Sequence, residues 1–484
     1  MNIQDLQPKA LWKNFADLNA VPRASKKEER VIEFAKQFGE GLGLPTQVDA
    51  VGNVIIKKPA TPGMEDRTTV VLQSHLDMVH QKNADTNFDF DTEGIKMLID
   101  GDWVKADGTT LGADNGIGVA TIMALLESTD IPHPPLEALF TIDEETGMTG
   151  AMGLVGGLLE GSIMLNLDTE DDDELTIGCA GGIDVTATGT YETIPTPAGY
   201  TAYKLTVKGL TGGHSGMDIH KGRGNANKLM NRLLYHMNQQ FDFHIAAIDG
   251  GSLRNAIPRE SFATIVINSN DAKKEQAFVA EWQDILKKEY QTTDPDLQLS
   301  LSACDLPSHV CSTAFQKQFI ASVYACPNGI YRMSPDIEDL VQTSNNLARV
   351  LLKEGAYKVL CLTRGSVDSE KLDEANAIVN TFELIGATVA LSGAYPGWAP
   401  NPTAKIVTIM SDLYQELYQE EAHVYACHAG LECGILGNNY PDMEMISFGP
   451  NIRGAHSPDE KVQISSVQKF WAYLLETLKR IPKA

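Results

Sequence analysis

Thr141-Ile142-Asp143-Glu144-Glu145-Thr146-Gly147 places three consecutive carboxylates and a glycine directly after an apolar run that begins at Leu136. The run predicts a buried strand that carries acidic side chains to its C-terminal end. Open α/β sheets place their binding sites at that edge. Adjacent side chains on a strand point to opposite faces, and the backbone can turn where the strand ends. Glu144 and Glu145 can therefore take different roles in one site, one binding a metal ion and the other handling a proton. Considered alone, the stretch is more typical of a solvated acidic turn.

Apolar strands and helical stretches alternate on both sides of this run. Two helices are predicted within residues 9–43, the second with Ser25 as its N-cap and Glu28 in the capping-box position. Further elements are predicted as strands at residues 51–56, 68–72 and 163–167, and as a helix at residues 115–126. This alternation indicates an α/β domain with a mostly parallel central sheet and helices on both faces.

The composition changes near residue 185, where a Thr- and Tyr-rich stretch with two prolines begins. A strand, a helix and a strand are predicted at residues 204–209, 224–238 and 261–268, and the pattern recurs at residues 358–363, 369–385 and 388–393. We therefore expect a discontinuous catalytic domain made of residues 1–185 and 399–484. Residues 186–398 form an inserted α+β domain, and its two similar patterns suggest two related halves.

Length, charge and cysteine usage bound the function. A chain of 484 residues is expected to form two or three domains. It carries 64 acidic against 39 basic residues, a formal charge of -25, which argues against nucleic acid or an anionic membrane as a partner. We predict no signal peptide and no membrane-spanning helix. The seven scattered cysteines include no Cys-x-x-Cys pair, so a reducing cytoplasm is expected.

Side chains that bind metals recur in five stretches, four of them at predicted strand ends or in adjoining turns. The ligand candidates are His75, Asp114, Glu144, Glu145, Asp168 and His456, with Asp77 two residues beyond the first histidine. His, Asp and Glu without Cys suit zinc, manganese or cobalt. Two imidazoles and three carboxylates are too many for one catalytic zinc, but they suffice for two ions if one carboxylate bridges them. One further carboxylate must stay off the metals to accept a proton, and Asp77 is well placed to orient His75.

Each candidate also has a simpler interpretation. A lone His-x-Asp is mostly a chance occurrence, and Asp114 could cap a helix. Asp168 could cap a turn, and His456 could lie in a surface turn. Spacing in the sequence does not by itself show that these residues converge.

The motifs together resemble a known family. The segments QSHLDMVH (73–80), LGADNGIG (111–118), TIDEETGMTG (141–150), LNLDTED (165–171) and GAHSPDE (454–460) are similar to those of the two-zinc peptidases that include aminoacylases and carboxypeptidase G. Among these, GAYPGW (393–398) and HAGLECG (428–434) favour the branch of aminoacyl-histidine dipeptidases, also called Xaa-His dipeptidase or peptidase D. The similarity runs nearly from end to end.

The resemblance implies a role for each core residue. Asp114 bridges two divalent metal ions, expected to be zinc with manganese or cobalt as alternatives. His75 and Asp168 complete one site, and Glu145 and His456 complete the other. Glu144 is the general base for a hydroxide held between the metals, Asp77 orients His75, and the peptide bond between Asp114 and Asn115 is expected to be cis.

The resemblance also assigns substrate contacts to the inserted domain, which corresponds to a lid that carries the contacts of a homodimer. His214 matches a histidine that donates to the oxyanion, Asn255 a residue that contacts substrate, and Arg364 the arginine that holds the substrate carboxylate. Taken alone, a histidine between glycines is more often part of a turn. Asn255 could likewise be a turn residue, and Arg364 could lie on an exposed surface. His428 and Glu432 receive no role.

The expected function is that of a cytoplasmic metallo-dipeptidase that hydrolyses Xaa-His dipeptides, carnosine-like substrates included, with a small peptide as its partner. The nearest alternative is a tripeptidase or an N-acyl amino acid deacylase of the same superfamily. A single-zinc enzyme and a non-catalytic binding protein are more distant alternatives.

Overall fold

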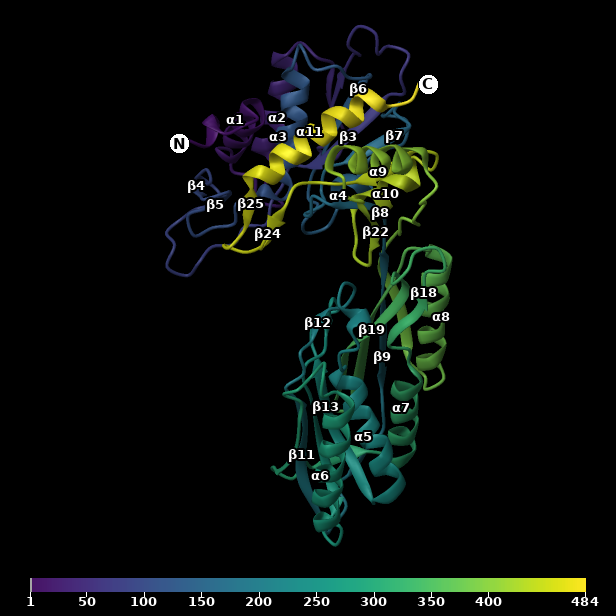
Figure 1. Ribbon diagram of the computed structural model, residues 1–484. Coiled ribbons are helices and arrows are strands. Elements are labelled where there is room, and N and C mark those ends of the chain that lie inside the picture. The colour runs from purple at the N-terminus through teal and green to yellow at the C-terminus, as the bar shows by residue number, and fades with distance from the viewer. Residues whose placement is uncertain (1) are drawn as a thin grey trace. The chain divides into compact units, whose positions relative to one another are not determined.

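The computed structural model describes residues 2–484, and the chain divides into two compact units. Unit 1 consists of Met1–Gly178, Trp398–Ala426 and Leu431–Ala484. Unit 2 consists of Cys179–Gly397 and Cys427–Gly430. Each unit is built on a large sheet of its own (Figure 1).

Unit 1 contains an eight-stranded sheet. Its strands are β1 (Thr46–Val48), β2 (Val54–Lys58), β3 (Val70–His75), β6 (Leu136–Thr141), β7 (Ile163–Asn166), β8 (Glu174–Cys179), β22 (His423–Cys427) and β23 (Glu444–Ser447). They lie in the order β1-β2-β6-β3-β7-β23-β8-β22. The four central strands, from β6 to β23, are parallel, and β2 and β8 pair with them antiparallel. The expected α/β class with a mostly parallel central sheet is confirmed.

β3, β6 and β7 are buried along their whole length, as expected for parallel strands covered on both faces. Their register brings their carboxyl ends together. His75 at the end of β3 pairs with Thr141 at the end of β6, and Gln73 of β3 pairs with Asn166 at the end of β7. The chain therefore leaves three neighbouring strands at one edge of the sheet.

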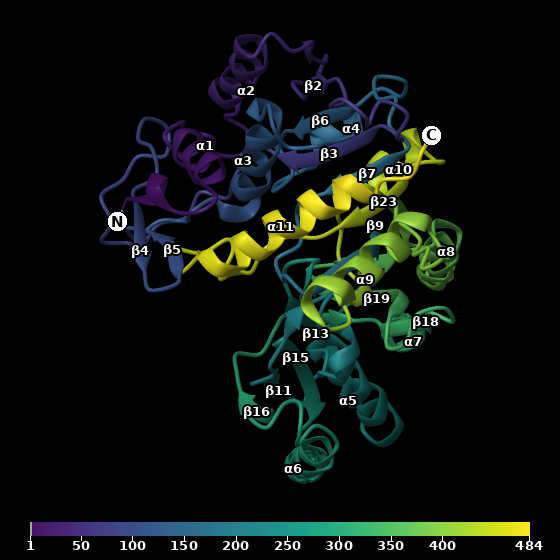
Figure 2. The same ribbon diagram turned by 45° about the horizontal axis from the view of Figure 1, so that its top comes forward.

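Helices and a small sheet complete unit 1. The helices are η1 (Ile3–Asp5), α1 (Lys9–Asn19), α2 (Glu29–Gly41), α3 (Ala113–Glu127), α4 (Thr149–Gly153), α9 (Lys405–Tyr418), α10 (Glu432–Asn439) and α11 (Ile464–Arg480). The small sheet has the order β24 (Ile452–Arg453), β25 (Lys461–Gln463), β5 (Trp103–Ala106) and β4 (Met97–Asp100). α3 packs on β3 and on α1, and α11 lies beside α9 (Figures 1 and 2).

The predicted elements of unit 1 are confirmed, but the predicted N-cap of the second helix is wrong. α2 begins at Glu29, Glu28 occupies the cap position, and no side chain caps the helix. The buried hydroxyl of Ser25 instead donates to Asp77 Oδ2 at 2.8 Å. A contact with a distant part of the chain has replaced the local capping interaction.

Unit 2 is built on a nine-stranded sheet. Its elements are β9 (Gly181–Thr190), β10 (Thr193–Pro195), β11 (Tyr200–Lys208), β12 (Gly213–His214), η2 (Ile219–Lys221), α5 (Ala226–Gln240), β13 (Phe243–Gly251), β14 (Ala256–Ile257), β15 (Ser261–Asn268), α6 (Ala272–Glu289), β16 (Gln298–Ala303), β17 (His309–Cys311), α7 (Thr313–Ala325), β18 (Gly329–Met333), β19 (Val341–Lys353), β20 (Ala356–Gly365), α8 (Asp368–Glu383) and β21 (Thr388–Tyr395). The sheet has the order β16-β11-β15-β13-β19-β20-β9-β21, and β18 pairs with β19. The remaining strands form the pairs β10–β17 and β12–β14.

One face of this sheet and the helices α5 to α8 share a single hydrophobic core. Successive side chains of β15 point to opposite faces of the sheet. Ile265 and Ile267 belong to that core, whereas Val266 packs with Ala202 of β11 and Val310 of β17. An antiparallel sheet with one well-covered face explains why the exposed strands of this region read as Thr- and Tyr-rich.

Several strands of unit 2 escaped prediction, β13 and β19 among them. β13 follows α5 directly and separates it from β15, so the expected strand-helix-strand pattern contains an additional strand. β19 is buried from Val341 to Ala348 although it begins with a run of polar residues. These polar side chains are hydrogen-bonded inside the unit, as Asn346 is to the carbonyls of Arg254 and Ala256, and so the hydrophobic pattern does not reveal the strand.

Across residues 2–484, no helix combines the length and the apolar character that crossing a membrane requires.

Candidate metal centre and substrate-binding residues

The chain turns sharply after β6. Asp143 has a φ of 56°, in the left-handed region, and its carboxylate is held by Lys26 and Thr146 and by the Thr149 hydroxyl at 2.6 Å. A non-glycine residue stays in this conformation only when its surroundings fix it. The turn brings Glu144 and Glu145 to the carboxyl edge of the sheet.

Asp77 ties this turn to the end of β3. The Glu144 N–H donates to Asp77 Oδ1 at 3.0 Å, and the Glu145 N–H donates to Asp77 Oδ2 at 3.3 Å. Asp77 Oδ1 also lies 3.4 Å from His75 Nδ1, while the Asp77 carbonyl is 3.2 Å from the same nitrogen. Ser25 holds the second carboxylate oxygen, so Asp77 is fixed from three sides.

Asp114 enters the cluster from the start of α3. Its dihedral angles (φ -80°, ψ 109°) are not helical, and the peptide bond from Asp114 to Asn115 is cis, as the resemblance implied. The Asn115 side chain donates to the Leu167 carbonyl at 2.5 Å, which joins this turn to the segment after β7.

The structure brings all seven residues predicted for the metal centre together in unit 1. The two oxygens of Asp114 face different imidazoles: Oδ1 lies 3.2 Å from His75 Nε2, and Oδ2 lies 3.1 Å from His456 Nε2. Each imidazole has a second carboxylate of its own. Asp168 Oδ1 is 3.6 Å from His75 Nε2, and Glu145 Oε2 is 3.0 Å from His456 Nε2. Glu144 lies slightly apart, 3.9 Å from His75 Nε2.

Burial, and after it the crowding of carboxylates, determines the electrostatics. Burial raises the pKa of Asp168 to about 6 and raises the pKa of Glu144 well above its usual range. Burial, with Asp114 and Asp168, also raises the pKa of nearby Glu170 to about 8. A bound cation would relieve this mutual repulsion.

The neighbouring carboxylates also raise the pKa of both histidines. Burial by itself would lower the pKa of His75, but Asp168 and Asp114 outweigh it and raise that pKa well above its usual range. Hydrogen bonds that His456 donates to Asp114 and Glu145 raise the pKa of its imidazole to about 11. Both imidazoles therefore lie in a region of negative potential, which would also attract a metal ion.

The residues present fit a metal centre. His75, Asp114 and Glu145 each offer a ligand atom, and these atoms lie within 4.8 Å of one another. Glu145 Oε1 is buried without a hydrogen-bond partner. A metal ion bound to this oxygen would satisfy it. Nitrogen and oxygen donors of this kind suit zinc, manganese or cobalt. A second acidic group, Glu28 with Asp77 and Asp143, is already occupied by Ser25, Lys26 and backbone N–H groups.

Unit 2 gathers the three residues predicted to contact substrate. Arg364, near the end of β20, is buried, and its Nη2 lies 3.5 Å from His214 Nε2. Its Nη1 donates to the Tyr395 hydroxyl at 3.0 Å. Asn255 stands beside His214 because β12 pairs with β14, and its carbonyl accepts the Ser215 N–H at 2.8 Å.

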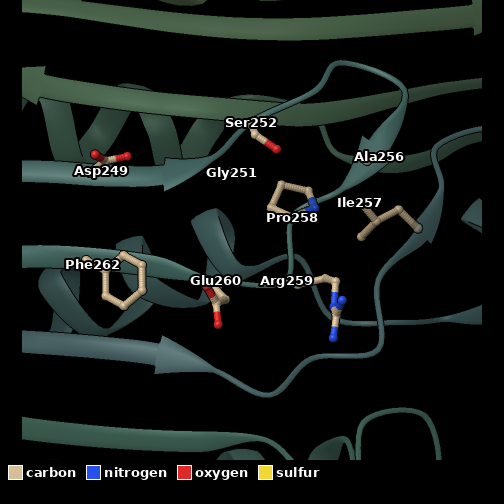
Figure 3. Close-up of a pocket in the computed structure, with 9 residues that line it drawn as sticks. All are labelled: Asp249, Gly251, Ser252, Ala256, Ile257, Pro258, Arg259, Glu260 and Phe262. Atoms are coloured by element: carbon tan, nitrogen blue, oxygen red, sulfur yellow. The ribbon is translucent and has the colours of Figure 1, made fainter. Parts of the chain in front are cut away.

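The branch motifs add to this group. His428 of HAGLECG is buried, and its Nε2 lies 2.7 Å from the Ser344 hydroxyl. Burial, with Arg364 close by, lowers the pKa of His428 to about 3, so this imidazole is neutral at physiological pH. The loop that carries Asn255 also forms one wall of a cavity of about 390 Å³ (Figure 3). The cavity is lined by residues distinct from the ten predicted ones: Asp249, Gly251, Ser252, Ala256, Ile257, Pro258, Arg259, Glu260 and Phe262.

The sequence pattern of peptidase family M20/M25/M40 matches residues 71–480, a range that includes all seven residues of the metal centre. The chain belongs to this peptidase family. Over 480 residues the M20 chain is 43% identical to the cytosol non-specific dipeptidase of Escherichia coli (strain K12), with 99% of each chain covered. It superposes on the crystal structure of the aminoacylhistidine dipeptidase from Vibrio alginolyticus with a TM-score of 0.95 at 45% identity, covering 100% of this chain and 99% of that one. The aminopeptidase PepT from Bacillus cereus, 15% identical with a TM-score of 0.58, covers 98% of this chain and 99% of its own and shares the fold alone.

No role was predicted for three buried charged residues of this M20 peptidase: Glu432, Glu460 and Arg23. Glu432, the first residue of α10, is buried and accepts hydrogen bonds from Thr141 Oγ1 at 2.6 Å and Gln73 Nε2 at 2.7 Å. Burial raises its pKa to about 7. Glu432 and Glu460 belong to the quoted motifs, which could have drawn attention to them. Arg23 lies outside every motif.

Proposed function

We propose that the protein is a metal-dependent dipeptidase that accepts Xaa-His dipeptides and works with two divalent metal ions, expected to be zinc. The observation that carries the proposal is the position of Asp114. Its two carboxylate oxygens face two different imidazoles, and each imidazole is paired with a second carboxylate. A site for one metal ion does not need a carboxylate that faces two histidines, whereas a carboxylate that bridges two ions must face both.

We assign His75, Asp168 and Asp114 to one ion, and His456, Glu145 and Asp114 to the other. When bound, such a pair of ions supplies Lewis acidity for the scissile carbonyl and lowers the pKa of a water molecule. Asp77 holds the His75 ring so that Nε2 faces inward, which is the usual arrangement behind a metal-binding histidine.

Glu144 is assigned the proton transfers. Its side chain is farther from the imidazoles than the ligand carboxylates are, and burial raises its pKa toward the range in which a carboxyl both accepts and returns a proton. It takes a proton from the attacking water as the new C–O bond forms. It then gives that proton to the departing amine nitrogen as the C–N bond breaks.

The residues of unit 2 are assigned recognition of the substrate's C-terminal carboxylate, of the oxyanion and of the peptide. Arg364 presents a buried guanidinium that is fixed by Tyr395, which suits a bidentate contact with the C-terminal carboxylate of a dipeptide. Burial beside Arg364 lowers the pKa of His214, so the ring can donate one neutral N–H to the oxyanion of the intermediate. Asn255, next to it on the hairpin, is assigned a polar contact to the peptide.

The substrate class follows from the relatives. The Escherichia coli protein is named a non-specific dipeptidase and the Vibrio alginolyticus protein an aminoacylhistidine dipeptidase, and both match over essentially the full length. We infer a dipeptidase that cleaves Xaa-His peptides without being restricted to them, in the cytosol.

The test is a panel of peptides given to protein stripped with EDTA and then supplied with zinc, manganese or cobalt. The panel contains Ala-His, β-Ala-His, Ala-Ala, a tripeptide and an N-acetyl amino acid. We expect metal-restored cleavage of the dipeptides, with Ala-His first. Cleavage led by the tripeptide or the acyl amino acid would replace the substrate assignment by the alternative of a tripeptidase or deacylase. Failure of every metal to restore activity would contradict the enzyme assignment.

The same panel tests Arg364 when it also includes Ala-His amide. Because a missing partner for a buried charge costs several kcal/mol, Arg364→Met should lower kcat/KM for Ala-His about 10²-fold, mainly through KM. The amide should already be a poor substrate of the wild-type protein and should lose little more in the variant. Arg349→Met, an arginine of the neighbouring strand that pairs with Asp249, is the matched control. Equal losses for the free peptide and the amide would exclude Arg364 as the carboxylate partner.

We further infer a homodimer formed through unit 2. β21 ends the nine-stranded sheet, and among the described strands it pairs with β9 only. Residues 388–395 are mostly exposed and include no charged residue and no proline, which are two of the features that block edge-to-edge pairing. Light scattering should give about twice 52.7 kDa for the wild type and the monomer mass for Leu391→Lys. A monomeric wild type at micromolar concentration would refute the inference.

A further inference from the structure

Arg23 is a fully buried arginine in the loop between α1 and α2. Its Nη1 donates to the carbonyls of Leu76 and Asp77 at 3.0 and 3.1 Å. Its Nη2 donates to the carbonyl of Gly112 at 2.5 Å and to the side-chain oxygen of Asn19 at 3.0 Å. Burial lowers its pKa to about 10, so the guanidinium remains charged at neutral pH.

Glu460 is an equally buried carboxylate four residues after His456. Its Oε2 accepts the N–H groups of Leu111 and Gly112 at 2.8 and 3.0 Å. Its Oε1 accepts the N–H groups of Ala113 and Asp114 at 2.7 and 3.2 Å. Four successive N–H groups thus converge on one carboxylate, as they do around bound anions.

The backbone around Gly112 is shaped to admit both groups. Gly112 has a φ of 69°, and a Cβ at this position would lie 2.4 Å from Arg23 Nη2. A Cβ at Gly116 would lie 2.6 Å from the same nitrogen. Gly112 and Gly116, two of the three glycines of the LGADNGIG segment, therefore leave the space that the guanidinium fills, and Gly112 also supplies the left-handed turn.

Burying two full charges is costly unless they perform a task that neutral side chains cannot. Here the charges are directed at the backbone. The guanidinium donates hydrogen bonds to three carbonyl groups in two separate loops. The carboxylate accepts hydrogen bonds from four N–H groups in the second of these loops, residues 111–114. Both polar groups of Gly112 are used, its C=O by Arg23 and its N–H by Glu460.

The three segments held in this way each carry a proposed metal ligand. His75 directly precedes the carbonyls of residues 76 and 77, Asp114 contributes one of the N–H groups, and His456 lies on the same short segment as Glu460. We propose that Arg23 and Glu460 are positioning residues, a buried clamp that fixes the loops of His75, Asp114 and His456 in their metal-binding arrangement before any metal binds. This inference rests on the metal centre proposed above.

The first measurement uses the wild-type protein without metal. If the clamp preorganises the site, hydrogen–deuterium exchange of the segment 111–114 should be slow in the EDTA-stripped protein and should change little when zinc is added. Rapid exchange in the stripped protein that becomes slow only with zinc would overturn the proposal, because the metal and not the clamp would then order the loop.

The second measurement compares zinc affinities by competition with a chromophoric chelator. Glu460→Gln keeps the size of the side chain but turns an NH₂ group toward backbone N–H donors, and Arg23→Lys keeps the charge without the planar fork. Each should weaken zinc binding 10- to 100-fold, the usual loss when a group behind a ligand is removed. In zinc-saturated protein, kcat should fall while KM for Ala-His changes little. Glu460→Asp should recover part of the affinity.

Glu137→Gln is the matched control. Glu137 is also buried, accepts two backbone N–H groups, from Glu160 and Gly161, and lies near the start of β6, away from the ligand edge. It should reduce resistance to urea without changing zinc affinity. If Glu460→Gln and Arg23→Lys behave like this control, the clamp is merely structural and the proposal fails. If the wild type itself binds no zinc, the proposed metal centre fails instead.

Discussion

Replacing Glu144 by glutamine should lower kcat for Ala-His about 10³-fold, within the range that a lost general base costs, while both metal ions remain bound. The amide has nearly the shape of the carboxyl but can neither accept the proton of the attacking water nor return it to the amine. Retained metal is expected because the two ligand sets can each be completed without Glu144.

The measurement is kcat by a discontinuous peptide assay together with metal content after desalting. Glu137→Gln, near the start of the strand that precedes Glu144, controls for the loss of a buried carboxylate elsewhere and should retain nearly full activity. Turnover close to that of the wild type, with metal present, would remove Glu144 from the proton transfers. Loss of a metal equivalent would instead make Glu144 a ligand.

The location of the site was predictable because parallel strands have a fixed polarity. The apolar runs before His75, Glu144 and Asp168 predicted strands of a mostly parallel sheet, and parallel strands of one sheet end at the same edge. That the three strands are neighbours came from the structure. His456 was a ligand candidate by its residue type alone, because it lies in a turn outside the sheet and strand polarity does not place it at that edge.

The support behind the ligands could not be predicted in the same way. Glu460 and Arg23 bind backbone groups, which every residue possesses, so no pairing of residue types in the sequence points to these contacts. Ser25 shows that a local sequence pattern can also predict a contact that does not form. Its spacing to Glu28 satisfies a capping pattern, yet its hydroxyl is used by Asp77, which lies 52 residues away. β19 was missed because its buried face is polar and is satisfied by hydrogen bonds rather than by apolar packing.

Asp114→Ala should have the broadest effect of any single substitution, because one side chain faces both imidazoles. We expect metal content to fall from about two equivalents toward zero and activity to drop by more than about 10³-fold, since the Lewis acid and the activated water are lost together. Asp168→Ala provides the contrast. It removes a partner of His75 alone, and so the set of His456, Glu145 and Asp114 should still retain about one equivalent.

Elemental analysis of the two variants beside the wild type separates the alternatives. A single-metal enzyme would show one equivalent at full activity in the wild type, and Asp114→Ala would then be no more harmful than the loss of any one ligand. Equal metal loss in Asp114→Ala and Asp168→Ala would contradict the assignment of Asp114 as the bridge. The bridging assignment requires the unequal result, because only Asp114 presents one oxygen to each histidine.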